Sequence, residues 1–136
     1  MEKVTIYHNP NCGTSRNVLA LLQACGLEVE VINYLETPPT EEKLKELLAQ
    51  MEITARELLR TNVPPYETLG LSDELKEDAI ISAMMTEPIL INRPIVVTSK
   101  GVKLCRPSEA VLEILPVQMM EDFVKEDGEV ISKPAY

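Results

Sequence analysis

The chain opens with a strand, a cysteine-containing loop, a helix and a second strand, and this order restricts the fold more than any other feature. Residues 4–7, Val-Thr-Ile-Tyr, are the β-branched and aromatic types typical of a short strand. After a loop over residues 8–12, apolar residues recur at helical spacing up to Gly26, which suits a helix C-cap. Residues 29–34 then have the partly alternating pattern of a second strand. This unit predicts a parallel strand pair joined by a right-handed crossover.

Cys12 lies on the loop just before the first helix, and Thr14 or Ser15 is the expected N-cap of that helix. Unpaired backbone N–H groups and the positive end of the helix dipole would then face its sulfur. Such surroundings stabilise a thiolate over a thiol, as a nucleophilic cysteine requires. The alternative is a small buried cysteine that happens to precede a helix.

Length and charge exclude several classes of protein. With 136 residues the chain is expected to form one domain with a real core. Its 13 basic and 22 acidic residues give a net charge of −9, which argues against nucleic acid or an anionic membrane as a partner. No secretory segment precedes the first strand, and no apolar run approaches the roughly 20 residues that span a bilayer.

The three cysteines, at positions 12, 25 and 105, form neither an even disulfide framework nor a metal-binding Cys-x-x-Cys pair. A reduced, cytoplasmic protein without a metal is therefore the expectation. Cys25 falls on the apolar stripe of the first helix, and Cys105 alternates with Leu104 near a strand end. Both are interpreted as packing residues.

The middle of the chain is predicted to be helical, and its end to return to strands. Thr40 caps a helix with one apolar face, Thr54 begins a capping box whose short helix ends near Arg60, and residues 64–70 are interpreted as irregular. A further helix is expected from Ser72 to about Met85, so residues 40–87 form a helical insertion. A strand after Pro94, a hairpin over residues 95–105 and a helix from Pro107 follow. For the polar tail, about 117–136, a terminal helix is the most that the pattern suggests.

This order of elements is that of a thioredoxin-like α/β core, with a four-stranded mixed sheet and the helical insertion in a single domain over residues 1–136. Several motifs also resemble the glutaredoxin-coupled arsenate reductases. They are His-Asn-Pro-Asn-Cys-Gly-Thr-Ser-Arg-Asn at 8–17, Tyr-Leu-Glu-Thr-Pro-Pro-Thr at 34–40, Leu-Leu-Arg at 58–60, Ile-Asn-Arg-Pro-Ile-Val-Val at 91–97 and Leu-Cys-Arg-Pro-Ser at 104–108. The resemblance extends from about residue 4 to residue 128.

The resemblance implies a role for seven residues. Cys12 would be the nucleophile, His8 would assist thiolate formation, and Ser15 would hydrogen-bond the sulfur. Arginine holds oxyanions through a planar pair of donors that never deprotonates, and the family implies such a set here. The implied oxyanion-binding residues are Arg60, Arg93 and Arg106, and Pro94 stands where thioredoxin-like folds carry a cis-proline.

The residues alone leave alternatives open at these positions. Each arginine could be a solvated surface side chain, and His8 could be a loop imidazole in water. Arg16 could contact the anion or lie on the exposed face of the first helix, and it is not assigned to the binding set.

Two residues that related enzymes use are missing just after Cys12, and this indicates that the electrons come from another molecule. Ser15 stands where a Cys-x-x-Cys pair would have its second cysteine, and Val18 stands where the phosphatase-like arsenate reductases have an arginine. The resemblance therefore implies arsenate as substrate, glutathione as co-substrate, glutaredoxin as partner and no bound metal or organic cofactor. Two alternatives are a monothiol oxidoreductase acting on glutathione-linked substrates and a redox-regulated transcription factor that binds RNA polymerase.

Overall fold

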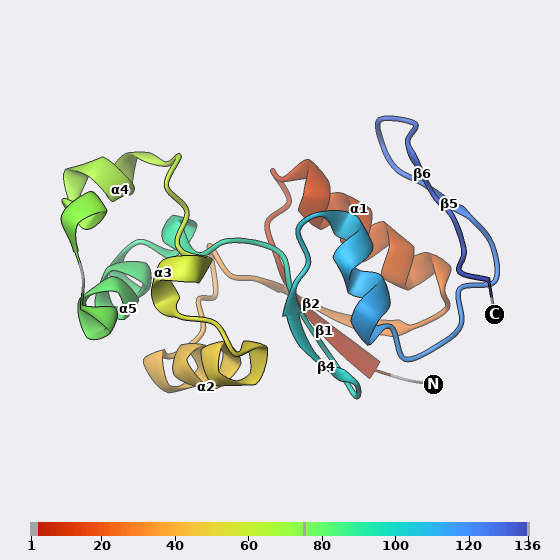
Figure 1. The fold of residues 1–136 in the computed structure, drawn as a ribbon, viewed down its shortest axis with the longest axis horizontal. Coiled ribbons are helices and arrows are strands. Elements are labelled where there is room, and N and C mark those ends of the chain that lie inside the picture. The colour runs from red at the N-terminus through yellow and green to blue at the C-terminus, as the bar shows by residue number, and fades with distance from the viewer. Residues whose placement is uncertain (1–2, 75, 136) are drawn as a thin grey trace. The chain divides into compact units, whose positions relative to one another are not determined.

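A computed structural model describes residues 3–74 and 76–135 of the chain (Figure 1). The chain divides into two compact units. One comprises the residues up to Ile32 and those from Arg93 onward, and the other comprises Asn33–Asn92. The helical insertion predicted at about 40–87 lies within the second unit.

The first unit is built on a four-stranded mixed sheet, as predicted. Its strands are β1 (Lys3–His8), β2 (Glu28–Asn33), β3 (Ile95–Thr98) and β4 (Gly101–Leu104), in the order β2-β1-β3-β4. Both β1 and β4 pair antiparallel with β3. Tyr7 lies opposite Ile95, and Ile95 lies opposite Leu104, so the residues that follow β1 and β4 emerge at the same end of the sheet as those that precede β3.

Two helical elements cover this sheet and close the core of the first unit (Figure 1). They are α1 (Gly13–Ala24), which connects β1 to β2, and the 3₁₀ helix η3 (Ser108–Ile114), which follows β4. The helix predicted after Pro107 is therefore of the tighter 3₁₀ type. The core residues that are fully buried are Ile6, Val18, Leu21, Leu22, Val96, Cys105 and Val111.

The tail forms a β-hairpin, so the terminal helix suggested by its sequence is wrong. Strands β5 (Phe123–Val124) and β6 (Val130–Ile131) pair antiparallel. The Gly128 N–H donates to the Lys125 carbonyl, and the Lys125 N–H donates to the Glu129 carbonyl. Gly128 has a φ of 89°, which glycine adopts without strain. These features define a three-residue hairpin loop with a glycine bulge, a connection that Asp127-Gly128 favours.

The second unit is helical, and two of its helix starts were correctly predicted. It contains α2 (Glu41–Met51), α3 (Ala55–Leu58), α4 (Pro64–Thr68), η1 (Leu71–Asp73), α5 (Glu77–Thr86) and η2 (Pro88–Leu90). The Thr40 hydroxyl accepts from the Lys43 N–H at the start of α2. Thr54 and Glu57 form the expected capping box at the start of α3.

Two predictions in this unit are wrong. Residues 64–68 are helical, because Pro64 and Pro65 occupy the first turn, where a helix needs no N–H from them. The helix expected from Ser72 begins at Glu77, since residues 71–73 form a separate 3₁₀ turn after Gly70, which has a φ of 66°.

No helix among residues 3–74 and 76–135 is both long enough and apolar enough to cross a membrane.

Truncating the buried side chain of Leu21 in α1 should destabilise the protein strongly. Leu21 is fully buried, so Leu21→Ala leaves a cavity and should lower the free energy of unfolding by about 2–5 kcal/mol. Gln23 is exposed on the same helix, and Gln23→Ala should change the free energy of unfolding by less than about 0.5 kcal/mol. Urea titration followed by circular dichroism measures both values, and equal losses in the two variants would contradict this packing.

Candidate active site

Cys12 is itself the N-cap of α1, so the prediction of Thr14 or Ser15 at that position is wrong. The helix begins at Gly13, and the Cys12 carbonyl accepts from the Arg16 N–H at 3.0 Å. Cys12 makes no hydrogen bond as a side-chain cap. Its sulfur therefore lies at the start of a twelve-residue helix, beside the free N–H groups of the first turn.

Two kinds of donor act on the Cys12 sulfur. Arg106 Nη1 donates to it at 3.5 Å, and the backbone N–H of Ser15 lies in the first turn of α1. Burial raises the pKa of the Cys12 thiol, but the Ser15 N–H dipole, the Arg106 hydrogen bond and the charges of Arg93 and Arg106 outweigh burial and hold the pKa below its ordinary value. The surroundings therefore favour the thiolate, as the sequence predicts for a reactive cysteine.

His8 and Ser15 form a buried polar cluster beneath the loop. A hydrogen bond of 2.6 Å joins His8 Nδ1 to Ser15 Oγ, and the Asn9 N–H donates to the same oxygen at 3.1 Å. Burial, followed by the charge of Arg16, lowers the pKa of His8, so the imidazole is neutral at neutral pH. The hydroxyl of Ser15 thus ties β1 to α1.

Arg93 and Arg106 flank the sulfur from the two segments next to β3 and β4. Arg106 Nη1 donates to the Arg93 carbonyl at 3.2 Å as well as to the sulfur. Both arginines precede a proline through a cis peptide bond: the Arg93–Pro94 bond has this form, and so does Arg106–Pro107, which the sequence did not indicate. The first unit therefore brings Cys12, Arg93 and Arg106 together.

Arg60 belongs to the second unit, where it follows α3. Its N–H donates to the Leu90 carbonyl at 2.8 Å, and its Nη1 donates to the Ile89 carbonyl at 3.5 Å. An isolated bridge pairs the preceding residue, Leu59, with Ile91. These contacts fix Arg60 within its own unit, and its place in the anion site stays a prediction.

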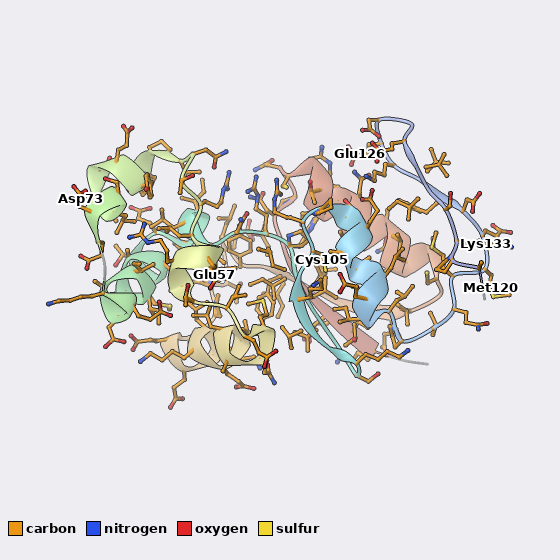
Figure 2. All side chains as sticks on the ribbon, viewed as in Figure 1. Glu57, Asp73, Cys105, Met120, Glu126 and Lys133 are labelled. Carbon is orange, nitrogen blue, oxygen red and sulfur yellow. The ribbon has the colours of Figure 1, made fainter. Side chains whose placement is uncertain are left out.

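Arg16, which the sequence left unassigned, makes a two-pronged ion pair with Glu126 of the tail hairpin. Arg16 Nε and Nη2 donate to the two carboxylate oxygens of Glu126 at 2.8 and 3.1 Å, and Nη1 donates to the Pro10 carbonyl. Figure 2 labels Glu126 on the hairpin beside the N-terminal end of α1. No local pattern in the sequence indicates a contact over 110 residues.

The other two cysteines are poor nucleophiles. Cys105 lies fully buried in the core, and burial raises the pKa of its thiol to about 12 (Figure 2). Cys25 is partly buried against the same core, and burial raises its pKa as well. Among the residues that the structure describes, no three His, Cys, Asp or Glu side chains cluster as metal ligands.

The first unit thus offers one stabilised thiolate next to guanidinium donors on a thioredoxin-like sheet. Thiolates attack electrophilic centres, and arginines bind the oxygens of anions. Fold and site together define a thioredoxin-like protein in which a thiol of lowered pKa lies beside guanidinium groups.

Comparisons with known proteins agree with this class. The ArsC family matches residues 7–114. The arsenate reductase of Escherichia coli strain K12 is 57% identical over 132 residues, 96% of this chain and 94% of that protein. The arsenate reductase of Rhizobium meliloti strain 1021 is 48% identical, over 94% of this chain and 92% of that protein.

Solved structures give the same result. A putative arsenate reductase from Yersinia pestis has a TM-score of 0.77 and 51% identity, over 82% of this chain and 99% of its own. An arsenate reductase from Vibrio cholerae has a TM-score of 0.79 and 46% identity, over 84% of this chain and 98% of its own. The chain belongs to the ArsC family.

Cys12 should be alkylated much faster than the other cysteines at neutral pH. Its pKa is lowered, whereas those of Cys25 and Cys105 are raised. Iodoacetamide labelling at a series of pH values, with peptide mass spectrometry, should give a midpoint for Cys12 below the ordinary thiol value of about 8.5. Arg106→Gln removes a donor to the sulfur and should move this midpoint upward. A Cys12 midpoint at or above the value of a free cysteine would show that the site does not stabilise the thiolate.

Proposed function

We propose that this protein is an arsenate reductase in which the Cys12 thiolate attacks arsenate. The observation that carries the proposal is the 3.5 Å contact between Arg106 Nη1 and Cys12 Sγ, which places a fixed cation beside a stabilised nucleophile. The name that its ArsC relatives in Escherichia coli and Rhizobium meliloti carry supports the substrate. The product is arsenite, and the role is arsenic detoxification.

The first step forms a bond between sulfur and arsenic. The Cys12 thiolate attacks arsenic, one arsenate oxygen leaves as water after protonation, and an arsenate–cysteine adduct remains. Arg93 and Arg106 bind the arsenate oxygens through charge-assisted hydrogen bonds, and we assign Arg60 to the same set by family resemblance. Arg106 is suited to both tasks, because it already donates to the sulfur that the anion approaches.

His8 and Ser15 are assigned a role in forming the Cys12 thiolate. The backbone N–H of Ser15 lowers the pKa of the Cys12 thiol, and the Ser15 hydroxyl is hydrogen-bonded to the buried imidazole of His8. The neutral imidazole is able to accept the thiol proton as Cys12 ionises. His8 and Ser15 are therefore assigned to thiolate formation, with Asn9 closing the cluster through its N–H.

The two electrons come from outside the chain. Cys25 and Cys105 have raised pKa values, which makes them poor internal resolving thiols. Glutathione adds to the arsenic of the adduct and displaces a second oxygen as water. A glutaredoxin thiolate then attacks the glutathione sulfur, so that a mixed disulfide forms, arsenic is reduced from As(V) to As(III), and water releases arsenite from Cys12. No prosthetic group takes part, and the need for reduced thiols fits the cytoplasm.

The two alternatives considered from the sequence are less well supported. A monothiol oxidoreductase acting on glutathione-linked substrates has no need of arginines beside its sulfur. A transcription factor controlled by a dithiol switch would need a second cysteine where Ser15 stands.

Removing the nucleophile should abolish the reaction without unfolding the protein. In an assay with arsenate, glutathione, glutathione reductase, glutaredoxin and NADPH, Cys12→Ser should show no arsenate-dependent NADPH oxidation. The Cys25→Ser, Cys105→Ala double variant should keep most of its activity, and omission of glutathione should stop turnover in every form. Residual turnover in Cys12→Ser would refute the mechanism, and a Cys12–Cys105 disulfide after one turnover would place the resolving thiol inside the chain.

Lysine should not replace the arginines of the site. Arg60→Lys, Arg93→Lys and Arg106→Lys keep the charge but lose the paired donors, so each should reduce kcat/KM for arsenate. A charge-assisted hydrogen bond contributes about 1.5–3 kcal/mol, which corresponds to a loss of tenfold or more. Arg56→Lys is the matched control and should leave kcat/KM for arsenate unchanged. The Arg56 guanidinium donates to the backbone carbonyls of Leu71 and Glu74, and Arg56 is not assigned to the anion site. Parental kinetics in all three site variants would rule out the anion assignment.

A further inference from the structure

Two consecutive residues on the turn of the tail hairpin reach two different segments of the first unit. Lys125 Nζ lies 2.9 Å from Glu109 Oε1, in the first turn of η3. The Glu126 carboxylate binds Arg16 in the first turns of α1, and its N–H donates to Asn17 Oδ1 at 3.0 Å. The hairpin turn is therefore attached at one point to α1 and at another to η3.

These two points lie close in sequence to the reacting groups. Arg16 and Asn17 follow Cys12 by four and five residues, and Glu109 follows Arg106 by three. At the other end of these two segments, Arg106 Nη1 contacts Cys12 Sγ. The α1 segment and the η3 segment are therefore joined twice, once by this contact and once through the hairpin turn.

Burial distinguishes the two attachments. In the Lys125–Glu109 pair the side chains are 11% and 41% exposed, whereas those of Arg16 and Glu126 are 44% and 49% exposed. The difference therefore lies at Lys125, and an ion pair with one shielded partner is screened less by salt than a pair with two exposed partners. Lys125 also contacts Glu129 Oε1 at 2.9 Å, but that contact stays within the hairpin and does not reach the site.

The hairpin lies outside residues 7–114, which the ArsC family matches. It contributes no group to the sulfur, whose charged neighbours are Arg16 from α1, Arg93 before β3 and Arg106 after β4. Any effect of Lys125 on the chemistry must therefore act through the segments that it joins.

We propose that Lys125 is a positioning residue, which acts through Glu109 to hold η3, and with it Arg106, against the Cys12 sulfur. The proposal rests on the proposed function in taking Cys12 as the nucleophile. When the Lys125–Glu109 pair is broken, η3 loses its ion pair with the hairpin, while the hairpin keeps its ion pair with Arg16 of α1. Arg106 then donates to the sulfur for a smaller fraction of the time, and both the thiolate and the bound anion lose stabilisation.

Lys125→Met removes the charge but keeps much of the side-chain volume. It should raise the midpoint of Cys12 alkylation by about 0.5 pH units, the change expected when a donor is lost for part of the time. It should also raise KM for arsenate several-fold more than it lowers kcat. Lys125→Arg should restore both values, because the longer cation is able to reach the same carboxylate.

Matched variants separate positioning from general stability. Glu109→Gln cuts the same link from the other side and should reproduce both changes, and the Lys125→Met, Glu109→Gln double variant should show no further change. Glu129→Gln removes the other partner of Lys125 and should leave both values unchanged. A Lys125→Met variant that loses thermal stability but keeps the alkylation midpoint and KM would overturn the proposal.

The alkylation measurement keeps this test separate from the proposed function. If Cys12→Ser retained arsenate reduction, the proposed function would fail, and the Cys12 midpoint in Lys125→Met would still decide whether Lys125 positions Arg106. If Cys12→Ser abolished activity while Lys125→Met and Glu109→Gln matched the parent, only the positioning role would fail.

Discussion

The chemistry proposed for this protein depends on the hydrogen bond from Arg106 to the Cys12 sulfur. It exists because of sheet register: Tyr7, Ile95 and Leu104 lie side by side on three strands, and the chain leaves the sheet at that end. The loop after β1 carries Cys12, the segment before β3 carries Arg93, and the junction after β4 carries Arg106. A slip of one residue between β3 and β4 would turn alternate side chains to the opposite face and move Arg106 out of reach.

The local parts of this arrangement were open to prediction from the sequence, and the distant parts were not. The strand and helix around Cys12, the caps at Thr40 and Thr54 and the strand after Pro94 follow from periodicity and capping chemistry within a few residues. The arginine pair needed the family resemblance, because junction positions alone do not show which side chains meet. The ion pair between Arg16 and Glu126 joins residues 110 apart, and no short-range pattern encodes it.

The wrong predictions have identifiable causes. The tail is polar enough to resemble a frayed helix, but Asp127-Gly128 favours a tight hairpin turn, and this signal was passed over. Pro64 and Pro65 were interpreted as helix breakers, although proline is well tolerated in a first turn. At the start of α1 a hydroxyl residue was expected as the cap, but Cys12 takes that position without a side-chain cap hydrogen bond. A Ser or Thr cap would use the N–H groups that the thiolate needs.

Two buried cysteines, Cys12 and Cys105, show which groups lower the pKa of a thiol in this protein. Cys105 is fully buried, and its pKa rises to about 12, whereas Cys12 is almost as well buried and its pKa falls. Burial raises both pKa values, and only at Cys12 do donors outweigh it. A helix N–H and Arg106 act on the Cys12 sulfur, while the Cys105 S–H donates to the Lys103 carbonyl, which stabilises no negative charge. Donors at a helix end and on a guanidinium therefore decide that the buried Cys12 thiol has a lowered pKa.

The same local balance explains how a chain with a net charge of −9 is able to bind an anion. Charges more than about 8 Å away are largely screened at physiological ionic strength, so most of the 22 acidic residues contribute little at the sulfur. Arg16 is matched by Glu126 on the hairpin, and the thiolate is stabilised by Arg93 and Arg106. The pairing with Glu126 uses Arg16 to hold the loop in place, while the cations that flank the sulfur remain those carried by the segments around β3 and β4. The proposed anion binding therefore depends on a few oriented donors, and the sign of the whole surface does not determine it.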